Sequence, residues 1–217
     1  MEDDYHSFVV TILHDGRAIE GVEVESVRTP WATCPMAARA MQALVGLPLA
    51  EGLRITAETR ASACTHMLDQ AALAIAHAAH GTPRLEYRME VEADADRVVR
   101  AQLDRDGRRL LDWRVVKGVV EGGAFDGLSV ASLTRHGAER LSPDVREAAT
   151  VLRRAIHVSG ARAIDMDAIA TAGSITATLA ATCYSLLPEN RGEARRNLGS
   201  ARDFSGEERW PLSEGAG

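Results

Sequence analysis

The stretch that decides the fold lies near the start of the chain: SFVVTILHDGRAIEGVEVESV, residues 7–27. Residues 7–13 are typical of a strand, His14-Asp15-Gly16 of a tight turn, and residues 18–27 of a returning strand. In the returning strand valines alternate with glutamates, so one face is expected to be buried and the other to meet solvent. The stretch therefore predicts an antiparallel hairpin.

Helices and further strands are expected after the hairpin. The first helix is predicted over residues 35–45 and the second over residues 65–80, each followed by glycine and proline. Periodicity and turn signals then predict strands at residues 85–91, 98–103 and 109–117, and helices at residues 142–158 and 174–187. The fold class is thus α+β: an antiparallel hairpin plus two helices, extended by further antiparallel strands and C-terminal helices.

The domain organisation follows from length and composition. Residues 1–82 are expected to form the hairpin-and-helix part, residues 83–188 to pack on the same unit, and residues 189–217 to form a polar, solvated tail. Residues 118–127 contain four glycines and are either a connector or a lid over a ligand. The apolar stretch 174–187 is either core or the contact of a homodimer.

Charge and hydropathy limit the class of partner. The chain has 31 acidic and 25 basic residues, a net charge of −6, so no basic surface for nucleic acid is expected. The most apolar stretch, around residues 70–79, is too short to cross a bilayer, and the opening MEDDYHSF lacks the features of a signal peptide. We expect a cytoplasmic protein that binds a small molecule, with no nucleic acid and no membrane among its partners.

Cysteines and histidines carry the densest chemical signal. Cys34 and Cys64 each precede a predicted helix, whose N-terminal dipole is expected to favour the thiolate. Cys64 and His66 lie on one helical turn, and His6 lies beside the first strand. His6, Cys34, Cys64 and His66 therefore form a candidate tetrahedral metal site for zinc or iron.

A site without metal is equally compatible with these residues. There His66 and His6 would be the catalytic proton-transfer groups, and Tyr184 or Tyr5 would hydrogen-bond to an oxygen of the substrate. A structural explanation is also open, because free cysteines are often small buried apolar residues.

Three motifs follow one another in the first part of the chain: WATCP at residues 31–35, LVGLPL at residues 44–49 and CTHMLD at residues 64–69. With these motifs, residues 5–79 resemble a bacterial domain-of-unknown-function family, DUF2889. This resemblance points to bacterial pathways for aromatic compounds, in which lyases expel a small carbonyl fragment such as formaldehyde. The resemblance thus implies a catabolic carbon–carbon lyase that acts on an aromatic or oxygenated small molecule.

The same region distantly resembles the iron–sulfur scaffold fold of NifU and IscU, in which a hairpin is followed by a cysteine before a helix. On that fold Cys34 matches the middle ligand, and Cys64 and His66 lie near the paired ligands. His6 falls near the first ligand, where the scaffold carries cysteine. This resemblance implies a second function, a metal or iron–sulfur binding module without catalysis.

Overall fold

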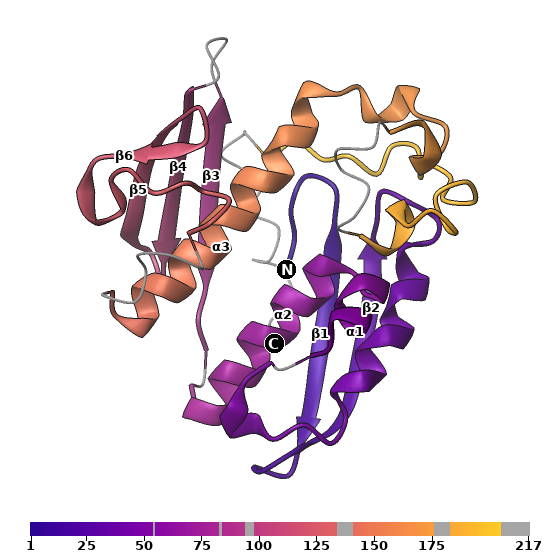
Figure 1. The fold of residues 1–217 in the computed structure, drawn as a ribbon, viewed down its shortest axis with the longest axis horizontal. Coiled ribbons are helices and arrows are strands. Elements are labelled where there is room, and N and C mark those ends of the chain that lie inside the picture. Colours follow the sequence, from indigo (N-terminus) through magenta and orange to yellow (C-terminus); the bar gives the residue numbers. More distant parts are fainter. Residues whose placement is uncertain (54, 83, 94–97, 134–140, 176–182, 205–217) are drawn as a thin grey trace. The chain divides into compact units, whose positions relative to one another are not determined.

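The protein is described by a computed structural model, which covers residues 1–53, 55–82, 84–93, 98–133, 141–175 and 183–204 (Figure 1). The chain divides into two compact units. Unit 1 comprises Met1–Pro83 and Asp165–Gly217, and unit 2 comprises Arg84–Ile164. Each unit combines an antiparallel sheet with helices, which confirms the α+β fold class.

These boundaries differ from the division at residues 82 and 188 that the sequence indicated. Residues 84–164 form their own unit because a sheet and a helix within that range close an apolar core between them. Residues 165–175 and 183–204 instead pack with the N-terminal part. The sequence pattern did not reveal this pairing, since it joins segments that are more than a hundred residues apart.

The hairpin of unit 1 consists of β1 (Ser7–His14) and β2 (Ile19–Arg28). The strands pair antiparallel, with Val9 opposite Glu25 and Ile12 opposite Val22. In the turn, the Asp15 carboxylate accepts hydrogen bonds from the backbone N–H groups of Arg17 and Ala18, each at 2.8 Å. The hairpin is the one predicted from residues 7–27.

Two helices cover the inner face of this hairpin. The helix α2 (Thr65–His80) packs on β1, and the 3-10 helix η1 (Cys34–Leu44) packs on β2 (Figure 1). Two short elements, η2 (Leu49–Glu51) and α1 (Ala57–Ser62), connect them. The core between hairpin and helices includes these buried side chains: Phe8, Ile19, Val22, Met41, Leu44, Met67, Leu68, Ala71 and Ile75.

Neighbouring residues explain where α2 ends and where η1 begins. The residue Gly81 ends α2 in the left-handed conformation, at φ 64°, which glycine adopts without a steric penalty. The predicted helix at residues 35–45 is present, but as a 3-10 helix with Pro35 in its first turn.

The C-terminal part of unit 1 packs beside η1. It contains η6 (Met166–Ala168), η7 (Ala172–Ser174) and η9 (Tyr184–Leu186). Trp31, Cys34, Ala172 and Ala194 form a small buried cluster there. The predicted helix at residues 174–187 falls largely on residues 176–182, which lie outside the described ranges.

Arg196 ties this part to the N-terminal region. Its guanidinium donates to the carbonyl of Pro30 at 2.9 Å, forms an ion pair with Asp167 at 2.8 Å and lies over the Trp31 ring. Ala194 and Arg196 are both buried, so the prediction of a solvated tail is wrong for this stretch. Buried guanidinium groups need such partners, and the sequence did not show where they were. Trp210, the one aromatic residue after position 204, lies outside the described ranges.

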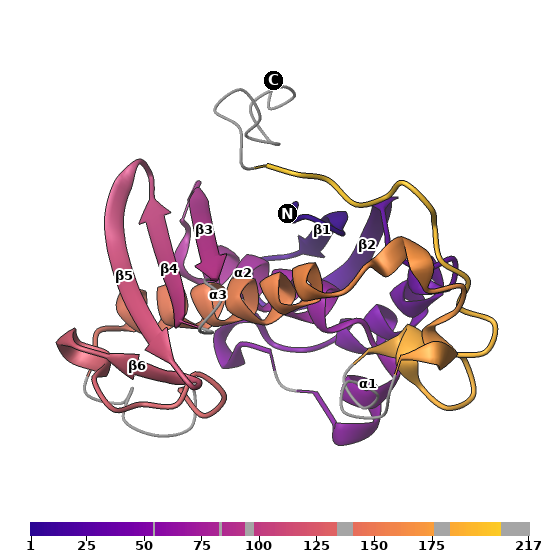
Figure 2. The same ribbon diagram turned by 90° about the horizontal axis from the view of Figure 1, so that it is seen from above.

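Unit 2 is a four-stranded antiparallel sheet with one long helix. The strands are β3 (Tyr87–Ala93), β4 (Val98–Arg105), β5 (Arg108–Val116) and β6 (Val119–Glu121), in that order across the sheet. The helix α3 (Pro143–Ser159) crosses one face of the sheet and is followed by η5 (Gly160–Ala163) (Figure 2). Ser142 is the N-cap of α3, and its hydroxyl accepts a hydrogen bond from the Val145 N–H, as the Ser-Pro-Asp pattern predicts.

The glycine-rich stretch 118–127 belongs to the core of unit 2. It contains β6 and η3 (Gly123–Phe125), and the side chains of Val120 and Phe125 are buried. The Phe125 ring meets Trp113 edge-on at 4.9 Å between centroids. This anchoring favours the connector interpretation over the lid.

None of the helices in the described ranges combines the length and the apolar character that a membrane crossing needs.

We expect the core between hairpin and α2 to dominate the stability of unit 1. Leu68 is 2% exposed, so Leu68→Ala should lower the free energy of unfolding by about 2–5 kcal/mol through lost burial and the resulting cavity. Leu198 is 74% exposed, and Leu198→Ala is the matched control, with a change within about 0.5 kcal/mol. Equal effects of the two variants in chemical denaturation would contradict this view of the core.

Candidate functional site

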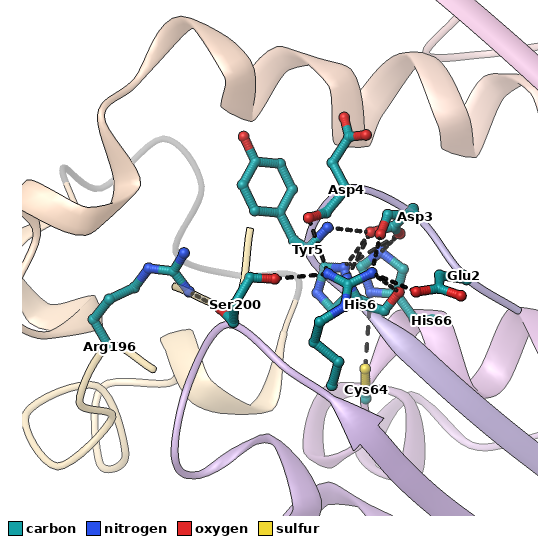
Figure 3. Close-up of polar contacts among 10 residues, drawn as sticks. Glu2, Asp3, Asp4, Tyr5, His6, Cys64, His66, Arg196 and Ser200 are labelled. Atoms are coloured by element: carbon teal, nitrogen blue, oxygen red, sulfur yellow. Dashed lines mark hydrogen bonds and ion pairs between the residues drawn. The ribbon is translucent and has the colours of Figure 1, made fainter. Parts of the chain in front are cut away.

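Three side chains that are distant in sequence converge at the start of the hairpin. Ligand atoms of Asp3, His6 and His66 all lie within 4.8 Å of one another. His66 is buried and the other two are largely buried (Figure 3). Among the histidine, cysteine, aspartate and glutamate residues of the described ranges, this is the group of three found at such separations. We call it the Asp3–His6–His66 cluster.

A tight turn positions the first two members. One carboxylate oxygen of Asp3 accepts hydrogen bonds from the backbone N–H groups of Tyr5 and His6, each at 2.8 Å. The backbone N–H of Asp3 in turn donates to the His6 carbonyl at 2.8 Å. Aspartate favours such turns because its short side chain reaches the backbone two or three residues ahead. His6 Nδ1 therefore lies 3.0 Å from Asp3 Oδ1.

The third member comes from the first turn of α2. The ring of His66 stacks on that of His6, with centroids 3.9 Å apart and planes inclined by 27°. Its Nε2 lies 3.8 Å from Asp3 Oδ2, and its Nδ1 lies 3.9 Å from Cys64 Sγ (Figure 3). Cys64, the residue that caps α2, thus contacts the side of the His66 ring that faces away from Asp3.

The charge of Asp3 is strongly stabilised. Burial by itself raises the pKa of this carboxyl, but the hydrogen bond with His6 and the charges of His6 and His66 outweigh it and lower the pKa to about 2. The Asp3 side chain is therefore an anion at any pH near neutrality. A largely buried anion beside two stacked imidazoles is a suitable partner for a cation.

The two cysteines do not behave as predicted. Burial raises the pKa of the Cys34 thiol to about 12, reinforced by the neighbouring Cys183 thiol and opposed by a hydrogen bond with Ser185. Burial and Cys183 likewise raise the pKa of the Cys64 thiol. The prediction that helix N-termini favour both thiolates is wrong for this chain in its metal-free form, because desolvation exceeds the dipole effect.

The predicted ligand set of two cysteines and two histidines is brought together only in part. His6 and His66 meet, and Cys64 lies beside His66. Cys34 Sγ instead lies 3.4 Å from Ser185 Oγ in the buried cluster around Trp31. Tyr184, predicted as a phenolic acid or base, packs against the apolar core of unit 1.

Sequence reasoning missed Asp3. The available signal was a carboxylate three residues before His6 in a run of acidic residues, a spacing that permits a turn with both side chains on one side.

The separations in the Asp3–His6–His66 cluster suit a first-row divalent metal ion. Ligand atoms about 2.0–2.2 Å from one ion lie roughly 3–3.5 Å from one another. The Asp3 oxygens lie 3.0 Å from His6 Nδ1, within this range, and 3.8 Å from His66 Nε2, so Asp3 and His66 would have to move slightly closer to bind one ion. Two histidines with one carboxylate leave coordination positions open, as catalytic zinc and non-haem iron(II) sites do.

Comparison with known proteins supports the family predicted from sequence. A family model described as Protein of unknown function (DUF2889) matches residues 2–80. Residues 2–80 are thus similar to that family. The DUF2889 segment contains all three members of the cluster and Cys64. No curated protein and no solved structure matches the chain, and the resemblance to the NifU and IscU fold is not confirmed.

The low pKa of Asp3 predicts a pH-dependent contribution to stability. The carboxyl pKa is about 2 in the folded protein against 3.8 for an unperturbed group, so its contribution is complete above about pH 4 and disappears as the pH falls through 2. Asp3→Asn retains an oxygen for the turn but loses the charge. With chelator present, we expect the variant to be less stable by about 2 kcal/mol at pH 6, with the difference vanishing towards pH 2. A difference that does not change with pH in urea unfolding would contradict this assignment.

Proposed function

We propose that this protein is a lyase that acts on a small oxygenated molecule at a divalent metal ion held by Asp3, His6 and His66. The observation that carries the proposal is the convergence of one ionised carboxylate and two imidazoles within 4.8 Å. Zinc and iron(II) are the ions that this donor set favours.

The contacts around the cluster support a ligand role. A metal-binding histidine usually has its second ring nitrogen held by a neighbouring group, which fixes the tautomer. Cys64 Sγ, 3.9 Å from His66 Nδ1, is placed to do this. Its raised pKa keeps Cys64 a neutral thiol in the metal-free protein, so it orients His66 without adding a charge.

The chemistry of a carbon–carbon lyase matches what such an ion supplies. Cleavage of a hydroxymethyl group requires loss of the hydroxyl proton, while the C–O bond becomes the C=O bond of formaldehyde. The electron pair of the broken C–C bond passes to the remaining fragment, which then takes up a proton. A bound divalent ion acidifies a hydroxyl group that contacts it and polarises an oxygen that receives charge.

The other residues and properties predicted from the sequence have the following standing in this proposal. His6 and His66, predicted as proton-transfer groups, are assigned here as ligands. Tyr184 as an acid or base stays a prediction. Aromatic substrates, formaldehyde as product and a cytoplasmic location also stay predictions.

Metal analysis tests the ligand assignment. We expect the purified protein to bind about one equivalent of zinc or iron(II), and we expect His6→Ala and His66→Ala to lose at least about nine-tenths of it. The exposed His14 offers the matched control, since His14→Ala removes a histidine from the same hairpin outside the cluster. Cys34→Ser should also retain the metal, because Cys34 contacts Ser185.

The outcomes separate the candidate sites. Loss of metal in Cys34→Ser would restore the set of two cysteines and two histidines. Equal metal content in His6→Ala and in the native protein would overturn the cluster as a metal site, leaving its imidazoles as proton-transfer groups.

Turnover distinguishes an enzyme from a metal-binding module without catalysis. Phenolic compounds and β-hydroxy ketones that carry a hydroxymethyl group can be offered, and formaldehyde release measured. We expect release with the native protein, and a decrease of at least about 100-fold in His66→Ala or after chelation. Stoichiometric metal without turnover of any of these compounds would favour the module.

A further inference from the structure

The backbone of the turn that carries Asp3 and His6 is held by one side chain from β2. The Arg28 guanidinium donates to the carbonyls of Asp3 at 2.6 Å, Asp4 at 3.0 Å and His6 at 3.3 Å. It also forms an ion pair with the Glu2 carboxylate at 3.0 Å. The side chain is 10% exposed, so these hydrogen bonds form largely out of solvent.

The same guanidinium reaches the C-terminal part of the chain. It donates to the Ser200 carbonyl at 2.7 Å and lies over the ring of Phe204, 5.9 Å from its centroid. The Arg202 N–H donates to the Asp4 carbonyl at 2.7 Å. Residues 200–204 therefore lie directly against the turn, and Figure 3 shows Ser200 on that side of the cluster.

These contacts cannot be replaced by charge alone. Arg28 serves five oxygen acceptors from two separate segments with its two terminal nitrogens. The guanidinium is planar and its donors diverge in fixed directions, whereas the lysine ammonium is a compact point charge. Lysine or glutamine at position 28 would leave carbonyls of the turn without this donor.

We propose that Arg28 is a positioning residue for the metal centre, and that residues 200–204 are part of the support of that centre. The inference rests on the proposed metal site. Arg28 fixes the backbone from Asp3 to His6, and thereby the separation of two of the three ligand side chains. Groups that orient metal ligands typically change affinity by 10- to 100-fold when they are removed.

The direction in which metal affinity changes when Arg28 is replaced distinguishes a positioning role from an electrostatic one. Arg28 carries a positive charge that contacts the backbone of two ligands. Removing a nearby positive charge, by Coulomb's law alone, strengthens the binding of a cation. Loss of the correct position of Asp3 and His6 weakens the binding of a cation. Arg28→Gln therefore tests the two explanations in opposite directions.

The experiment measures the affinity of the full chain for Co²⁺ or Zn²⁺, together with the visible absorption of bound Co²⁺. We expect Arg28→Gln and Arg28→Lys to bind roughly 10- to 100-fold more weakly than the native protein and to show an altered Co²⁺ spectrum. Circular dichroism at the same temperature establishes that each variant is folded.

Two controls separate this effect from general destabilisation. Arg17→Gln removes an exposed arginine from the same hairpin and should leave the affinity unchanged. Ile75→Val removes a buried methyl group from the core of unit 1, nine residues after His66 in α2, so it should lower the melting temperature but change the affinity less than 3-fold.

Each result has a defined meaning. Affinity in Arg28→Gln equal to or tighter than in the native protein would overturn the positioning role while leaving the metal site intact. An equal loss of affinity in Ile75→Val would reduce Arg28 to a contributor to stability. Absence of metal binding in the native protein would overturn the proposed function, and the positioning role with it.

Discussion

The packing of α2 on the inner face of the β1–β2 hairpin is the interaction on which the rest of unit 1 depends. Phe8 follows His6 by two residues and Leu68 follows His66 by two, and both apolar side chains are fully buried in one core. Burial of a side chain of this size contributes about 1.5–3 kcal/mol. The two imidazoles stack because the residues beside them cannot leave that core without losing this energy.

Two buried ionisable groups in unit 1 have pKa shifts in opposite directions, although burial alone raises the pKa of both. At Asp3 it is overcome by imidazole and backbone donors, and the pKa falls to about 2. At Cys34, where the partners are a hydroxyl and other thiols, burial dominates and the pKa rises to about 12. A position before a helix was therefore a poor guide to reactivity, because the surrounding hydrogen-bond donors decide which protonation state is favoured.

Much of the fold was predictable because its signals are local. The alternation of valine and glutamate, the Asp-Gly turn and the glycine after α2 act within a few residues, and each is found where the sequence indicated. In the candidate site, His6 and His66 were predicted from their places beside a strand and a helix. The contribution of Asp3 and the separation of Cys34 from the cluster were not predicted. Each depends on which side chains from other segments of the chain lie next to that residue in the folded protein.

The sequence by itself determined the α+β class, the hairpin, the helix α2 and two of the three members of the cluster. Only the tertiary structure decided that residues 165–175 and 183–204 join the N-terminal part, that Arg28 holds the turn of Asp3 and His6, and that the Cys34 and Cys64 thiols are buried and neutral. The physical reason is the distance along the sequence over which each kind of interaction acts. Propensities, caps and turns are encoded in neighbouring residues, whereas burial and hydrogen-bond partners come from segments up to 172 positions apart.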